Sequence, residues 1–289
     1  MVDRAFPLNE ADVAPVIAGL LGAKLVRSEP HTDGRINMVR RVELSDGRVL
    51  GVKHYARGRS YAIEGAALRT LAGVVPVPEV VYTLDRVIAY RWIEGETLEG
   101  CRLSDPAALA GLAEPLGRVL GALARSPRDG EPPDLTPTLA RLAHGPARER
   151  LGGALADRLA RLLEVEGLDD ATGFVHGELD AHAVIVSPGR DQIAGVIDWE
   201  TATAGPAQRS AGNALCDVGS LLRVPSAFDP GFRAAFARGH GALPADWWWR
   251  ARLVDATRLV AVLADRGPWS DSHAGLRAII AGVVANYRR

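Results

Sequence analysis

The sequence changes character near residue 95, from strand-forming runs to helical periodicity, and this change limits the fold more than any other feature. In the first part, the β-prone runs Met38–Leu44 and Val49–Tyr55 flank an Asp-Gly turn, which predicts a β-hairpin. Apolar residues recur at helical spacing over Tyr61–Ala72, which predicts one helix. Val87–Ile93 is a further predicted strand, whereas Val74–Val81 is extended because its two prolines exclude a helix.

Beyond Asp105 the pattern is helical, apart from two short β-runs, Ala183–Val186 and Ile193–Ile197. Asp105 and the proline after it form a capping pair for a helix that runs to Leu123. The other predicted helices lie near Leu151–Glu166, Asp217–Leu222, Pro230–His240, Trp247–Asp265 and Ser272–Tyr287. We therefore expect an α+β chain with a small antiparallel-sheet N-lobe over residues 1–93 and a larger, mainly helical C-lobe over residues 94–289.

Composition limits the class of protein. Hydrophobic residues make up 47% of the 289 residues and charged residues 24%, which is the balance of an ordinary globular protein. The formal net charge is −1, so we expect no nucleic-acid partner and no attraction to an anionic membrane. Weakly polar stretches such as Ala278–Val284 are shorter than the ~20 residues that span a bilayer. Two cysteines and the absence of a secretory leader pattern predict a cytoplasmic location.

A lysine and a glutamate form the first candidate site. Lys53 is one of only two lysines and ends a predicted strand, and Glu64 lies on the helix that follows. A buried ammonium group requires an anionic partner, so Glu64 is predicted to hold Lys53 where its amine can meet phosphate oxygens. A solvated lysine and a solvated helical glutamate are the alternative.

Acidic side chains beside the β-runs form two further candidate sites. In the loop Phe174–Ala183, Glu178 could accept a proton, and Asp180 or His182 could bind a metal ion. A polar turn with a capping aspartate is the alternative for this loop. Asp198 ends an apolar strand, where its carboxylate leaves the sheet and suits magnesium, with a turn-capping role as the alternative.

In this order, the segments resemble the aminoglycoside phosphotransferase and choline kinase branch of the protein-kinase-like superfamily. The catalytic loop of that family reads His-Gly-Asp-x-x-x-x-Asn and its metal segment reads Ile-Asp-Trp/Phe-Glu. The matching segments here are His176-Gly177-Glu178 and Ile197-Asp198-Trp199-Glu200. Asp217 resembles the aspartate that supports the catalytic loop from behind. Asp33–Asn37 resembles the nucleotide-covering loop, and Tyr90–Glu94 resembles the hinge that receives adenine.

The resemblance implies a bilobal protein-kinase-like fold and Mg2+-assisted phosphoryl transfer from ATP or GTP to a hydroxyl group. Lys53, braced by Glu64, would hold the α- and β-phosphates, and Asp198 would bind magnesium. Glu178 would orient the acceptor hydroxyl and take its proton, while His176 would support the loop. The other nucleotide-binding positions that the resemblance implies are Gly34, Asn37, Tyr90, Trp92 and Ile197.

Two positions depart from the family pattern. Glu178 stands where the family has aspartate and is longer by one methylene group, and Ala183 stands at the metal-binding asparagine and has no ligand atom. Asp180 is a better substitute ligand than His182, because magnesium prefers oxygen. The departures leave open a slow kinase, a kinase with shifted geometry, and a nucleotide-binding pseudokinase with little or no turnover.

The acceptor is the least defined partner. We expect a small hydroxylated molecule, an aminoglycoside-like antibiotic or another natural product, with the Ser or Thr hydroxyl of a peptide as an alternative. Asp255 and Asp265 are candidates for contact with a cationic acceptor, although arginines crowd the same segment. The loop Gly205–Leu215 is either a specificity loop or a surface insertion. Of the three rings in Trp247–Trp249, we expect at least one to lie near the surface or a pocket wall.

Overall fold

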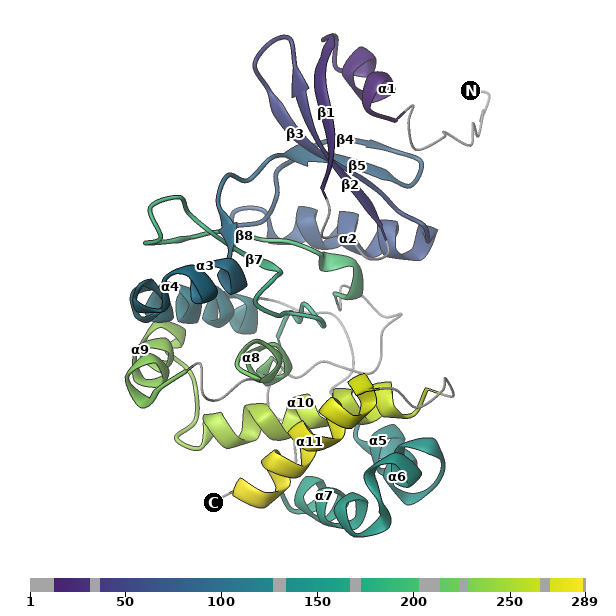
Figure 1. Ribbon diagram of the computed structural model, residues 1–289, viewed down its shortest axis with the longest axis vertical. Coiled ribbons are helices and arrows are strands. Elements are labelled where there is room, and N and C mark those ends of the chain that lie inside the picture. The colour runs from purple at the N-terminus through teal and green to yellow at the C-terminus, as the bar shows by residue number, and fades with distance from the viewer. Residues whose placement is uncertain are drawn as a thin grey trace.

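A five-stranded antiparallel sheet forms the smaller lobe, at the top of Figure 1. The computed structural model describes residues 13–31, 37–126, 134–166, 173–202, 214–223, 228–265 and 271–287. The strands of the sheet are β1 (Leu25–His31), β2 (Met38–Leu44), β3 (Val49–His54), β4 (Val80–Leu84) and β5 (Val87–Arg91). Across the sheet they follow the order β1-β2-β3-β5-β4.

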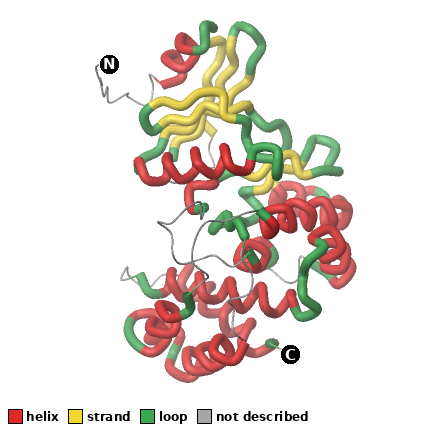
Figure 2. The backbone as a smooth tube through the Cα atoms, turned by 180° about the vertical axis from the view of Figure 1, so that it is seen from behind, coloured by secondary structure: helices red, strands yellow, loops and turns green. Residues whose placement is uncertain are grey.

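Side chains alternate between the two faces of this sheet, and each face is covered by one helix. Leu50 and Val52 of β3 pack in one cluster with α1 (Val13–Leu20). Lys53 has the opposite orientation and pairs with Ile88 of β5, whose side chain packs in the cluster that includes α2 (Gly58–Leu71). Figure 2 shows α2 between the sheet and the larger lobe. The alternation therefore directs Lys53 toward the junction of the lobes.

The larger lobe is mainly helical, with a small sheet of three strands beside the first lobe. Its helices are α3 (Leu98–Ser104), α4 (Pro106–Arg125), α5 (Thr136–Ala143), α6 (Pro146–Leu151), α7 (Gly153–Glu166), α8 (Leu215–Leu221), α9 (Pro230–His240), α10 (Trp247–Leu263) and α11 (Asp271–Asn286). Its strands are β6 (Glu96–Thr97), β7 (Val184–Val186) and β8 (Ile193–Val196), and a 3-10 turn, η1 (Trp199–Thr201), follows them.

Helix α4, 20 residues long, packs in the core of the larger lobe. Its N-cap Asp105 accepts a hydrogen bond from the backbone N–H of Ala108 at 3.2 Å, and Pro106 occupies the first turn. Gly117 lets α9 approach closely, because a Cβ there would lie 2.1 Å from the carbonyl oxygen of Phe236. Among the described helices, α4 alone is long and apolar enough to cross a membrane, contrary to the expectation of short stretches only. Half of the most apolar 18-residue stretch of α4 is buried inside the protein.

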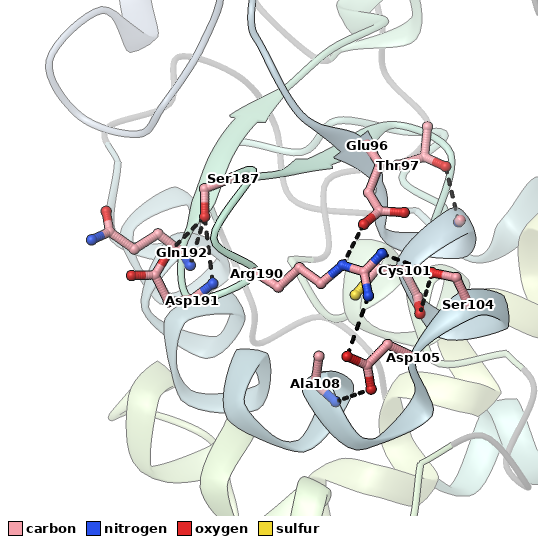
Figure 3. Close-up of polar contacts among 11 residues, drawn as sticks. Glu96, Thr97, Cys101, Ser104, Asp105, Ala108, Ser187, Arg190, Asp191 and Gln192 are labelled. Atoms are coloured by element: carbon pink, nitrogen blue, oxygen red, sulfur yellow. Dashed lines mark hydrogen bonds and ion pairs between the residues drawn. The ribbon is translucent and has the colours of Figure 1, made fainter.

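Arg190 connects the turn between β7 and β8 to β6, α3 and the start of α4 (Figure 3). Its Nε donates to the Glu96 carboxylate at 2.6 Å, its Nη2 to the Ser104 hydroxyl at 3.1 Å, and its Nη1 to Asp105 at 3.2 Å. Asp105 is also the N-cap of α4. One guanidinium group therefore joins β6, α3 and α4 to the hairpin that leads to Asp198.

The expected α+β architecture, a sheet lobe and a helical lobe, is confirmed. Only the end of the extended segment Val74–Val81 joins the sheet, as β4, and the carbonyl of Pro76 accepts a hydrogen bond from the Val196 N–H of β8 at 2.8 Å. Within Trp247–Trp249, the first two rings are buried and the third is half-buried, as expected. Most of the loop Gly205–Leu215 lies outside the described residues.

Candidate active site

Lys53 is the centre of a polar cluster between the lobes. Its amine donates to Glu64 Oε2 at 2.8 Å and to Asp198 Oδ1 at 2.7 Å. The Lys53 and Glu64 side chains are each 2% exposed, whereas that of Asp198 is 56% exposed. Carboxylates from both lobes therefore hold one buried amine, and the alternative of a solvated lysine and glutamate does not hold.

The electrostatics of this cluster favour the charged form of Lys53. Burial opposes the ammonium form, but the carboxylates of Glu64 and Asp198 outweigh it and raise the pKa of Lys53 above its ordinary value. Burial raises the pKa of Glu64, and the Lys53 ammonium opposes that rise. Because Asp198 is open to solvent, Lys53 can exchange this partner for the phosphate oxygens of a ligand.

Asp198 reaches Lys53 from a left-handed backbone conformation. After β8, the Ile197 N–H donates to the carbonyl of Ala183 at 2.9 Å, and Asp198 follows with φ 64° and ψ 48°. Residues other than glycine seldom adopt this region, and aspartate is among those that tolerate it. The Asp198 side chain makes no capping hydrogen bond to η1, so the turn-capping alternative does not apply. The backbone turn leaves the carboxylate exposed at the junction of the lobes.

His176 links the predicted catalytic loop to the predicted metal segment. The ring is fully buried, with Nε2 2.8 Å from the Ile197 carbonyl oxygen and Nδ1 accepting the Glu178 N–H at 3.3 Å. These partners assign the neutral tautomer with its proton on Nε2. The ring also packs against Trp199, with 4.5 Å between centroids. His176 thus orders the backbone on either side of the site.

Asp217 lies behind the same loop. Its two carboxylate oxygens accept the backbone N–H groups of His176 at 2.6 Å and Gly177 at 3.0 Å. Burial raises the pKa of Asp217, and the hydrogen bonds from the two backbone N–H groups oppose the rise. Gly177 has φ +89°, and a Cβ there would lie 2.6 Å from the Thr201 carbonyl oxygen. Glycine at this position therefore lets the loop pass close to η1.

The acidic residues of the loop have different surroundings. Glu178 is 57% exposed in its side chain, and its Oε1 lies 3.1 Å from Nη2 of Arg258 on α10. Asp180 Oδ1 accepts the backbone N–H groups of His182 at 2.8 Å and Ala183 at 3.2 Å. One oxygen of Asp180 therefore caps the turn, as in the capping alternative.

Two of the predicted nucleotide positions lie on or just after β5. Tyr90 is buried against Gly51 of β3, where a Cβ would lie 2.2 Å from its ring. Burial raises the pKa of Tyr90. The half-buried Trp92 packs edge-on against His31, at 5.5 Å between centroids, and under the guanidinium of Arg41 at 5.8 Å. Tyr90 therefore shares the sheet face of Lys53, while Trp92 contacts β1 and β2.

Asn37 joins the lobes. Its Nδ2 donates to Glu200 Oε2 at 2.7 Å across 163 positions of sequence, and its Oδ1 accepts the Ala56 N–H at 3.1 Å. Both polar atoms of this amide are thus engaged by the protein. Ile197 lies beside Asp198, with its carbonyl bound to His176. The predicted contact of Gly34 lies outside the described residues.

A model of the phosphotransferase enzyme family matches residues 28–253, which include both carboxylates around Lys53 and the His176 loop. The chain belongs to this family. The match confirms the resemblance drawn from the sequence motifs. Members of the phosphotransferase family transfer phosphoryl groups, so the coarse class of chemistry is a small-molecule phosphotransferase. A comparison with curated proteins finds no match.

Solved structures of phosphotransferases share the fold of the chain. The apoenzyme of the macrolide 2′-phosphotransferase MphH from Brachybacterium faecium has a TM-score of 0.68 at 19% identity, over 96% of this chain and 98% of its own. An aminoglycoside phosphotransferase in complex with GDP and kanamycin has a TM-score of 0.68 at 16% identity, over 96% and 99%. The choline kinase LicA from Streptococcus pneumoniae has a TM-score of 0.65 at 14% identity, over 96% and 99%. The protein-kinase-like fold is therefore confirmed.

The donor chemistry of the family site fits a magnesium ion. Asp198 supplies an exposed carboxylate, and magnesium takes one or two carboxylates together with phosphate oxygens and water. Ala183 supplies no ligand atom, and Asp180 holds a turn with one of its oxygens. No group of three or more His, Cys, Asp or Glu side chains in the described ranges is arranged as a metal site. Asp198 is therefore the residue that would hold magnesium with the help of a nucleotide.

Two contacts in the candidate active site are not predicted by the sequence pattern. Arg258 touches the carboxylate of Glu178, and Glu200 binds Asn37. In the sequence, Arg258 is one of several arginines near Asp255, and the pattern gives it no particular role. Asp255 itself is buried and accepts two hydrogen bonds from Arg223, at 2.8 and 2.7 Å, so this candidate acceptor contact is engaged by the protein.

Proposed function

We propose that the protein is a cytoplasmic, Mg2+-dependent phosphotransferase that moves the terminal phosphoryl group of ATP or GTP to a hydroxyl of a small molecule. The convergence of Lys53, Glu64 and Asp198 carries this proposal. Lys53 and Asp198 are 145 positions apart, and their side chains meet at 2.7 Å. A buried ammonium beside an exposed carboxylate is an arrangement that can neutralise and position a polyphosphate.

In the proposed reaction the protein mainly positions charge. Glu64 holds the Lys53 amine, which would hydrogen-bond the phosphates of the nucleotide once it is released from Asp198. Asp198 would then be the carboxylate ligand of magnesium, which, when bound, offsets the negative charge of the phosphates. The left-handed backbone of Asp198 and the His176 contact with Ile197 fix where that carboxylate lies.

Glu178 is the proposed acid–base residue. Its exposed carboxylate would orient the acceptor hydroxyl toward the terminal phosphorus. As the bond from phosphorus to the leaving nucleoside diphosphate breaks and the bond to the acceptor oxygen forms, the hydroxyl proton passes to Glu178. The Glu178 N–H bond to His176 and the Asp217 bonds behind the loop hold the backbone that carries this side chain.

The proposed acceptor is a hydroxylated natural product, with antibiotics as the first class to test. Structural neighbours of the chain include a macrolide 2′-phosphotransferase and an aminoglycoside phosphotransferase bound to kanamycin. Identities of 16–19% support a shared fold, so the acceptor class stays part of the proposal. A panel of macrolides, aminoglycosides, choline and fructosamines covers the kinds of substrate named for these neighbours.

A pseudokinase is the second candidate, because Ala183 has no ligand atom and Asp180 already caps a turn. The test incubates the protein with magnesium, the acceptor panel, and ATP or GTP radiolabelled in the terminal phosphate. Transfer that is lost in Lys53→Met and Asp198→Asn supports the kinase. Magnesium-nucleotide binding without transfer to any acceptor or to water supports the pseudokinase. Absence of nucleotide binding refutes both candidates.

A further inference from the structure

A guanidinium group contacts the proposed acid–base residue from a distant helix. Arg258 on α10 places Nη2 3.1 Å from Oε1 of Glu178. Its other terminal nitrogen, Nη1, donates to the hydroxyl of Ser220 on α8 at 3.1 Å. The same guanidinium therefore bridges the catalytic loop and the α8–α10 pair.

Further hydrogen bonds hold Ser220, the partner of Arg258 on α8. Ser220 is buried and also accepts a hydrogen bond from Nη2 of Arg223 at 3.0 Å. Arg223 is held in turn by both oxygens of the buried Asp255, at 2.8 and 2.7 Å. Bidentate arginine–carboxylate pairs are geometrically restrictive, so the series Asp255–Arg223–Ser220–Arg258 ends in a guanidinium of defined position. Glu178 makes its ion pair with that end.

Glu178 needs such a restraint. Its side chain is 57% exposed and has three rotatable bonds, so a free carboxylate would sample several rotamers. Holding a glutamate side chain in one rotamer costs conformational entropy. Arg258, only 25% exposed, selects the rotamers in which one oxygen reaches it and leaves the second oxygen for another partner.

We propose that Arg258 is a positioning residue, which holds the Glu178 carboxylate in the orientation that receives the acceptor hydroxyl. The inference rests on the proposed phosphotransferase function. It differs from an ordinary surface ion pair, because the arginine is backed by a buried hydrogen-bond network and its partner is the group nearest the chemistry.

The experiment compares Arg258→Ala, Arg258→Lys, Glu178→Asp and the double variant Arg258→Ala/Glu178→Asp. Each is assayed for transfer to the best acceptor of the panel, and for nucleotide hydrolysis, in which water replaces the acceptor. We expect Arg258→Ala to lower kcat on the order of 10- to 100-fold, the size of a misplacement near 1 Å, with the nucleotide KM unchanged. Arg258→Lys should recover part of kcat, because its ammonium keeps the charge but not the second hydrogen bond.

The double variant tests the contact itself. Aspartate is shorter by one methylene group and withdraws from Arg258, so adding Arg258→Ala to Glu178→Asp should lower kcat less than threefold further. Arg118→Ala is the control, because it removes an exposed ion pair with Glu114 on α4 and should leave all rates unchanged. Circular dichroism and thermal unfolding check that each variant is folded.

The outcomes separate the inference from the proposed function. An active wild type in which Arg258→Ala keeps its kcat, or changes only an acceptor KM, refutes the positioning role and leaves the phosphotransferase intact. The positioning role is also refuted if the fall in kcat of the double variant equals the product of the falls in Arg258→Ala and Glu178→Asp. Two residues that act independently give this result. A wild type that transfers phosphate neither to an acceptor nor to water refutes the proposed function, and the inference with it.

Discussion

Replacing Lys53 by methionine should destabilise the protein through the glutamate that it leaves behind. Methionine keeps most of the volume of the lysine stem, so the change removes a charge without opening a large cavity. Glu64 is then a buried carboxylate without its ammonium partner at 2.8 Å. The side chain of Asp198 is 56% exposed, so water can solvate its carboxylate in the variant. The loss of stability therefore comes from the unpaired carboxylate of Glu64.

The expected loss is about 3–5 kcal/mol of unfolding free energy near pH 8, the usual cost of breaking a buried ion pair from one side. The loss depends on pH. Burial raises the pKa of Glu64, and Lys53 is what opposes that rise, so the pKa of Glu64 in Lys53→Met is higher still. A carboxyl whose folded pKa is raised stabilises the fold fully below its unfolded pKa and loses that contribution as the pH rises. The deficit of Lys53→Met relative to the wild type should therefore shrink as the pH falls, over the range in which Glu64 is protonated in the variant but still ionised in the wild type.

Urea unfolding at pH 5 and pH 8, with titration calorimetry of magnesium-nucleotide, measures both consequences. The matched control is Lys53→Met/Glu64→Leu, which removes both charges and should return to within about 1 kcal/mol of the wild type, while nucleotide binding stays lost. A single variant that unfolds within about 1 kcal/mol of the wild type at both pH values would show that Glu64 is not a buried, paired carboxylate. The electrostatic reasoning for the whole site would then be wrong.

Three further outcomes follow from other parts of the structure. Burial lowers the pKa of His240 to about 4, so its contribution to stability, complete above about pH 6.5, is lost as the pH falls. His240→Gln should therefore reduce the loss of unfolding free energy between pH 7 and pH 5, measured in urea. Gly177→Ala should lower stability by about 2–4 kcal/mol, because φ +89° is strained and the Cβ meets Thr201, whereas Gly22→Ala, in open space at φ +70°, should cost about 1 kcal/mol in thermal unfolding. Arg190→Ala should cost about 1–2 kcal/mol in the same assay, because three partly exposed contacts are lost together.

The elements that the sequence predicted are those with strong local signals. The hairpin of β2 and β3 has alternating apolar residues around an Asp-Gly turn, and α4 begins with an N-cap aspartate and a proline. The order of Lys53, Glu64, His176 and Asp198 along the chain leads us to expect these residues in one site. The structure places Lys53 against Glu64 and Asp198, and His176 against the carbonyl of Ile197 beside Asp198.

The elements that were missed have weak local signals. Helix α1 has only eight residues, and β1 contains Pro30 among charged residues, so tertiary packing rather than propensity decides their structure. The contact between Arg258 and Glu178 depends on the rotamers of two long side chains on separate elements. No sequence period encodes such a contact, and nothing in the arginine-rich segment distinguishes Arg258 from its neighbours.

Two side-chain contacts between the lobes meet at one short segment. Asp198 binds Lys53 and Glu200 binds Asn37, so residues 198–200 receive two side chains from the sheet lobe. In the proposed function, phosphates and a cation would compete with the first contact, because they would occupy Lys53 and Asp198. The second contact includes neither Lys53 nor Asp198, so it can persist when the first is broken. Nucleotide binding would thus replace the contact between Lys53 and Asp198 with a ligand that bridges them. The contact between Asn37 and Glu200 would continue to hold the two lobes together.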